Sequence, residues 1–129
     1  MLLYEFPCFY NSFVPVESKR RTFTLEDTKR LLPKVQARTV EAVEDARHLS
    51  ETLAQVSDSD PLRVRILKEL DGVVKDWARD ITAMGLVPNG LWLVDFDNGD
   101  GYYCWKHPES SVQHYHSYED GFAGRVKII

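Results

Sequence analysis

The chain has 129 residues, of which 43% are apolar and 28% are charged, a composition that fits one globular domain and excludes disordered and fibrous proteins. Its formal net charge is -4 at pH 7, and its basic run Lys19-Arg20-Arg21 is too short for duplex nucleic acid, whose binding relies on many clustered Lys and Arg side chains. No stretch reaches the roughly 18 to 20 continuous apolar residues needed to cross a bilayer, which excludes a membrane-spanning protein.

Residues 1–22 are predicted to form an N-terminal extension to a single domain over residues 23–129. The apolar start MLLYEFPCFYNSFVPV has no basic segment before it and no small-residue cleavage site after it, so it does not match a signal peptide. We therefore expect a soluble cytoplasmic protein. In that reducing compartment Cys8 and Cys104, far apart in the sequence, are expected to remain free thiols.

Residues 24–85 are predicted to form a helical hairpin. In TFTLEDTKRLLP, Thr24 is a good N-cap residue and Asp27, three residues later, can complete a capping box. Pro33 has no amide to donate to the Lys29 carbonyl, so a kink or restart is expected there. The main helix should then run from about Pro33 to Val56.

The second helix of the hairpin is predicted to start after SDSDP, where Asp60 caps and Pro61 occupies the first helical position. It should end at Gly85, a typical C-cap glycine. Both helices show apolar residues at alternating spacings of three and four, which indicates a coiled-coil-like antiparallel pair. A second surface of the hairpin must be covered, either by a second copy in a homodimer or by the C-terminal layer of the same chain.

Residues 91–129 change to a strand-like pattern. LWLVDFD and DGYYCWK flank Asn98-Gly99, which favours a hairpin with a two-residue loop in which Asp97 faces Asp100. VQHYHSY resembles a third strand, and Val126 and Ile128 are expected to supply a short fourth. The expected fold is α+β, with the helical hairpin packed on a three- to four-stranded antiparallel sheet whose helix-facing side carries Trp92, Val94, Phe96, Tyr103 and Trp105.

The stretch CWKHPESSVQHYH contains four candidate metal ligands, Cys104, His107, His114 and His116. Cysteine and histidine are ligands that zinc and other transition metals prefer. Whether Cys104 and the two later histidines share a face of the sheet depends on the strand register, which the turn does not fix. A structural zinc site usually uses two closely spaced ligand pairs, so the pattern alone does not predict a cofactor.

Two further sites can be built from this region. Cys104, His116 and Asp95 could supply the nucleophile, base and orienting group of a thiol-dependent enzyme, although a cysteine within a strand is usually a small core residue. Arg125 could clamp a carboxylate or a small anionic metabolite, or could form an ion pair with Asp95, Glu119 or Asp120. The two glycines of GFAGR suggest a tight turn that lets Phe122 plug the core.

Five short motifs occur in order: FTLEDTKRLLP, GL before LVDF, CW, a histidine, and GFAGR. Together they resemble domain of unknown function 2203, a family of small prokaryotic proteins without an assigned activity. The resemblance covers residues 23–129 and implies that Asp95, Cys104, His116 and Arg125 are its candidate binding residues. His107 and His114 fall where the family pattern usually has apolar or aromatic residues, which argues against a four-ligand metal site.

The sequence therefore favours a non-enzymatic binding or self-association module that forms a homodimer through its helical hairpin. The alternative is a metal-dependent or thiol-dependent enzyme centred on Cys104 and His116. No partner of the nucleic acid or membrane class is expected.

Overall fold

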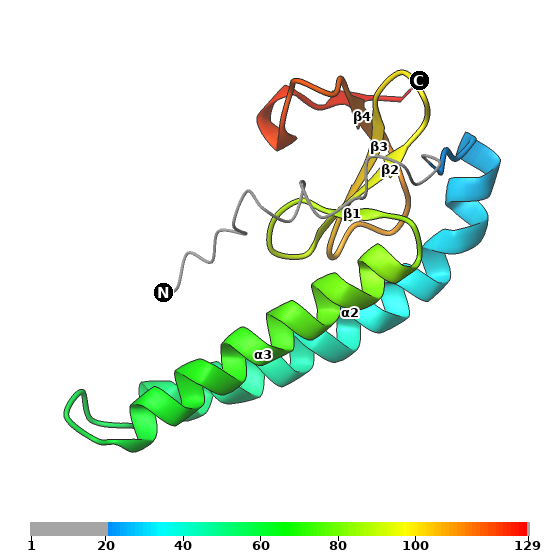
Figure 1. Ribbon diagram of the computed structural model, residues 1–129. Coiled ribbons are helices and arrows are strands. Elements are labelled where there is room, and N and C mark those ends of the chain that lie inside the picture. Colours follow the sequence, from blue (N-terminus) through cyan, green and yellow to red (C-terminus); the bar gives the residue numbers. More distant parts are fainter. Residues whose placement is uncertain (1–20, 129) are drawn as a thin grey trace.

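The computed structural model describes residues 21–128; Cys8 and most of the predicted extension over residues 1–22 lie outside this range. The described chain is α+β, as predicted, with two long helices side by side and a sheet packed at one end of them (Figure 1). None of its helices is long and apolar enough to cross a membrane. The elements are α2 (Leu25–Ala54), α3 (Leu62–Ala83), β1 (Val87–Pro88), β2 (Leu93–Asp97), β3 (Tyr102–Lys106), β4 (His114–His116), the 3-10 helix η1 (Phe122–Gly124) and β5 (Val126–Lys127).

The ends of the helical hairpin follow the predicted capping residues. The Thr24 hydroxyl accepts from the Asp27 amide at 3.0 Å while the Asp27 carboxylate accepts from the Thr24 amide at 3.1 Å, which is the predicted capping box. Asp60 accepts from the Leu62 amide at 2.9 Å. At the end of α3, Gly85 has a φ of +85°, the left-handed conformation expected of a C-cap glycine.

The predicted restart at Pro33 does not occur, because α2 is one continuous helix of 30 residues that contains Pro33. The missing amide removes one hydrogen bond, to the Lys29 carbonyl. The neighbouring side chains of Leu32 and Val35 are only 5% and 0% exposed. Their burial against the rest of the core offsets the cost of the proline, so tertiary packing keeps the helix intact.

The two helices of the hairpin contact each other through buried and polar side chains. The Trp77 indole donates to the Thr39 hydroxyl at 3.0 Å, and Arg38 pairs with Asp80 across the helices at 2.6 Å. The buried positions of α3 begin at Ile66 and Leu70, whereas no residue between positions 43 and 65 is buried. These residues, 43–65, form the outer part of the hairpin, which projects away from the sheet (Figure 1).

The sheet has five antiparallel strands in the order β1-β2-β3-β4-β5, one more than the upper limit expected from the sequence. The additional strand is β1, in a stretch that resembles a turn because it contains Pro88 and Gly90. Proline is tolerated there because β1 is an edge strand, where one backbone amide needs no partner in the sheet.

The hairpin between β2 and β3 has a longer loop than predicted. Asp97 pairs with Tyr102 rather than with Asp100, so the loop contains four residues, 98–101. The Asn98 side chain accepts from the amides of Asp100 and Gly101 at 2.9 and 2.8 Å, and this local bonding stabilises the wider turn. The register moves by two positions, so every side chain keeps its predicted face.

The helix-facing side of the sheet carries the predicted aromatic residues. Val94, Phe96 and Trp105 are buried in the same cluster as Trp77 and Ile81 of α3. The opposite face carries Asp95, Cys104, His114 and His116, which alternate with these core positions.

Candidate functional site

The register of β3 and β4 brings the cysteine and the later histidines to one face of the sheet. Cys104 lies directly opposite His114 on β4 and directly opposite Asp95 on β2. His116 is two positions from His114 and therefore projects from the same face. The structure thus gives the register that the turn sequence left open.

Three of these side chains form a compact buried group that we call the buried triad: Asp95, Cys104 and His116. One ligand atom from each lies within 4.8 Å of the other two. Asp95 and Cys104 are 0% exposed and His116 is 2% exposed. Polar groups buried to this extent need partners, because removal from water otherwise costs several kcal/mol.

The hydrogen bonds of the buried triad fix the position of one proton. His116 Nδ1 lies 2.8 Å from the Ser117 carbonyl oxygen, which can only accept, so Nδ1 carries a hydrogen. Nε2 then faces Asp95 Oδ1 at 3.1 Å. That contact is favourable when one proton lies between the two atoms. The other Asp95 oxygen accepts from the Asn89 side-chain amide at 2.9 Å.

The electrostatics of the triad favour retention of its protons. Burial raises the pKa of Asp95 above its usual value, despite opposing contributions from His116 and Asn89. Burial alone would lower the pKa of His116, but the Ser117 carbonyl and Asp95 outweigh burial and raise it. Burial, followed by the charge of Asp95, raises the pKa of Cys104 to about 12. The Cys104 thiol is therefore protonated at neutral pH.

Arg125 lies beside the triad but pairs with a residue other than those expected. Its guanidinium donates to both Glu109 carboxylate oxygens, at 3.1 and 2.6 Å, and not to Asp95, Glu119 or Asp120. It also contacts the Cys104 thiol. Phe122 does not plug the core: it is 39% exposed, and Arg125 and Lys106 each lie over its ring. The physical reason is that the segment containing η1 lies away from the two helices that supply the core (Figure 1).

The two remaining histidines of the predicted metal site occupy different environments. His107 packs beside Trp105, with ring centroids 6.3 Å apart, at a position that alternates with Cys104. His114 shares the face of the triad, but its Nδ1 lies 3.7 Å from the nearer Glu109 oxygen, too far for a hydrogen bond. Of the four metal ligands expected from the sequence, Cys104 and His116 lie close together, and Asp95 lies close to both. His114 lies on the same face of the sheet, whereas His107 lies elsewhere.

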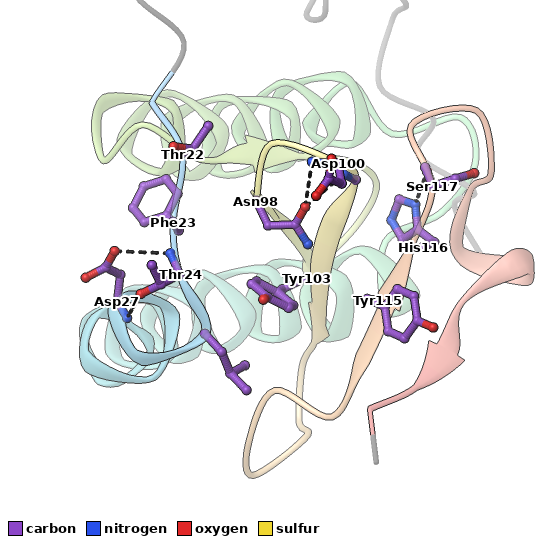
Figure 2. Close-up of a pocket in the computed structure, with 12 residues that line it drawn as sticks. Thr22, Phe23, Thr24, Asp27, Asn98, Asp100, Tyr103, Tyr115, His116 and Ser117 are labelled. Atoms are coloured by element: carbon purple, nitrogen blue, oxygen red, sulfur yellow. Dashed lines mark hydrogen bonds between the residues drawn. The ribbon is translucent and has the colours of Figure 1, made fainter.

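An open cleft adjoins the triad at His116. It has a volume of about 660 Å³ and lies between the N-terminus of α2 and the β3–β4 end of the sheet, as Figure 2 shows. Tyr103 and Tyr115 line it from the sheet, Phe23 and Thr24 from the chain before α2. No sequence signal pointed to this cleft, because its walls come from three separate segments of the chain.

Sequence reasoning missed two residues that hold the site in place. Asn89 orients Asp95, yet it lies in a stretch that reads as a turn. Glu109 fixes Arg125, yet it lies in the loop between β3 and β4. Both contacts depend on tertiary structure.

Comparison with known proteins supports the resemblance drawn from the short motifs. No curated protein and no solved structure matches the chain. The model of the uncharacterized conserved protein family DUF2203, domain of unknown function 2203, matches residues 21–128. Because this match spans most of the chain and includes the triad, Arg125 and Glu109, the protein belongs to the DUF2203 family.

Proposed function

We propose that the protein is a non-enzymatic binding module whose buried triad takes up one divalent transition-metal ion. The observation that supports this most strongly is the convergence of a carboxylate, a thiol and an imidazole within 4.8 Å. A mixed oxygen, sulfur and nitrogen donor set suits zinc, cobalt or iron better than magnesium or calcium. The Ser117 carbonyl already holds Nδ1 of His116, as the outer partners of metal-bound histidines commonly do, and leaves Nε2 for the ion.

Charge balance supports the same proposal. Without a metal ion, one proton is shared between Asp95 and His116 and a second is held by the Cys104 thiol, so the triad is neutral. A divalent ion that replaces both protons leaves a carboxylate, a thiolate, a neutral imidazole and two positive charges, which again sum to zero. The exchange therefore avoids the large cost of burying a net charge.

The burial of the triad supports binding rather than catalysis. A catalytic metal keeps a coordination position open to substrate, whereas Asp95 and Cys104 have no exposed surface. A thiol nucleophile is disfavoured as well, since burial raises the pKa of Cys104 to about 12 and a reactive cysteine needs a thiolate near neutral pH. The function that fits is a bound ion that stabilises the fold.

The test is a Co²⁺ and Zn²⁺ titration of the full chain, purified without an affinity tag. We expect one ion per chain, a thiolate-to-cobalt absorption band in the near ultraviolet, and release of two protons per ion. Ion at 100 times its dissociation constant should stabilise the fold by about 2.7 kcal/mol. C104A should lose the thiolate band, whereas the matched control C8S should retain it. The absence of stoichiometric binding, or equal binding by C104A, would contradict the proposal.

A second candidate function is self-association through the helical hairpin. It is supported by the outer part of the hairpin, residues 43–65, where no residue is buried although the apolar spacing continues through Leu49 and Leu53. Val64 in this part is 71% exposed. A second hairpin would cover such a surface in a four-helix arrangement.

A further inference from the structure

We propose that His114 supplies the fourth ligand of the metal site, so that Asp95, Cys104, His114 and His116 together enclose the ion. This inference rests on the proposed metal binding and names the coordination that completes it. Three protein ligands leave one position of a tetrahedral ion unfilled, and structural zinc sites fill all four with protein atoms. A site as buried as the triad offers little room for a bound water.

The strand register places His114 beside the missing position. His114 lies directly opposite Cys104 on the neighbouring antiparallel strand, where the Cβ atoms of opposed residues are typically about 4.5–5.5 Å apart. An ion bonded to the Cys104 sulfur at about 2.3 Å therefore lies within the span of a histidine side chain at that position. His114 and His116 alternate with Tyr115 and so face the same side.

The His114 side chain has a buried ring nitrogen whose hydrogen-bonding capacity is unsatisfied. Its Nδ1 is, among residues 21–128, the one buried side-chain nitrogen or oxygen without a hydrogen-bond partner. Buried polar atoms are rarely left unpaired, and each such case calls for an explanation. The nearest acidic atom is Glu109 Oε2, 3.7 Å away, and Arg125 holds that carboxylate firmly.

A turn of the His114 side chain toward the ion gives Nδ1 a partner in either of two ways. Nδ1 can bond the ion directly, or Nε2 can bond it while Nδ1 donates to Glu109. The second arrangement repeats the carboxylate–histidine–metal pattern of many metal sites, and it matches the way the Ser117 carbonyl supports His116. Glu109 and Arg125 then act as positioning residues around the ligands.

His107 is the matched control, because it belongs to the same sequence stretch but packs beside Trp105. Co²⁺ titrations of wild type, H114A, H114Q and H107A should be followed by visible absorption, in which four-coordinate Co²⁺ gives d–d bands several times stronger than five- or six-coordinate Co²⁺. Both His114 variants should keep the thiolate band, lose most of the d–d intensity and bind about 10- to 100-fold more weakly or worse. H107A should match wild type.

The outcomes separate this inference from the proposal on which it rests. If wild type binds Co²⁺ with the thiolate band, and H114A and H114Q match it in band intensity and affinity, His114 is not a ligand while metal binding by the triad stands. If wild type gives no thiolate band at all, the metal site and the fourth ligand both fail. Far-UV circular dichroism checks that each variant is folded.

Discussion

At the scale of single residues, the site depends on partners that lie far apart in the sequence. Asp95 is held by Asn89 and His116, and Arg125 by Glu109. The Arg125–Glu109 pair is two-pronged and mostly buried, with side chains 16% and 25% exposed. Such charge-assisted pairs contribute more to stability than exposed ion pairs do.

Glu109 should make stability depend on pH. Burial would raise its pKa, but Arg125 and the Lys106 amide outweigh burial and hold the pKa below its usual value of 4.5. A lowered pKa in the folded state means that the carboxylate stabilises the fold above about pH 4.5 and that this contribution is lost as pH falls through the folded-state value. E109Q should therefore lower the free energy of unfolding by about 1–2 kcal/mol at pH 7.

Urea unfolding of wild type and E109Q at pH 7, 4.5 and 3 measures this effect. The difference between them should shrink toward pH 3, because below about pH 4.5 the unfolded chain takes up a proton that the folded-state Glu109 resists, so the contribution of the carboxylate falls. E119Q, which changes an exposed carboxylate, is the control and should differ little from wild type at any pH. A wild-type-to-E109Q difference that stayed constant down to pH 3 would rule out the Glu109 carboxylate as its source.

At the scale of elements, two glycines show how the same residue type serves different purposes. Gly101 ends the β2–β3 loop, where an added Cβ would lie 2.5 Å from the backbone oxygen of His116. Gly72 lies inside α3, and an added Cβ there meets nothing within 4 Å. The first glycine is needed for close strand packing, whereas the second weakens a helix.

Alanine substitution should therefore have opposite effects at the two positions. G72A is expected to raise the free energy of unfolding by about 0.5–1 kcal/mol, from helix propensity and reduced freedom of the unfolded chain. G101A should lower it by about 2 kcal/mol or more, because the backbone of β4 must move. Thermal and urea unfolding measure both. Equal effects of the two variants would contradict the close approach of Gly101 to β4.

At the scale of the whole molecule, the hairpin extends beyond the sheet that covers it. The outer part of the hairpin, residues 43–65, carries apolar residues but no buried position, and a lone helical pair buries a single stripe. The proposed second copy would cover this region. Such an interface would be independent of the buried triad at the other end of the molecule.

Light scattering on a size-exclusion column should give twice the 14.9 kDa mass of one chain at micromolar concentration. V64K places a charge on the most exposed large apolar side chain of the described residues and should shift the mass toward the monomer without loss of helicity. A monomer mass for wild type at these concentrations would exclude the dimer. Metal uptake should be the same in V64K and wild type.

Much of the fold could be predicted because its signals are local. The Thr24–Asp27 cap, the Gly85 C-cap and the alternation of strand residues depend on neighbours in the sequence, and each appears as expected. The parity of the alternation was sufficient to assign the faces of β2 and β3, even though the loop length was wrong. The α+β class follows from the change of hydrophobic period after residue 85.

The site depended on contacts that the sequence pattern does not encode. Pro33 remained inside a helix because distant side chains bury its neighbours, and Asn89 and Glu109 became partners of Asp95 and Arg125 only through folding. The sequence by itself determined which side chains share each face of each strand, since that follows from a period of two. The tertiary structure alone decided that Asp95, Cys104 and His116 meet, because register between strands is set by packing and loop geometry across the whole sheet.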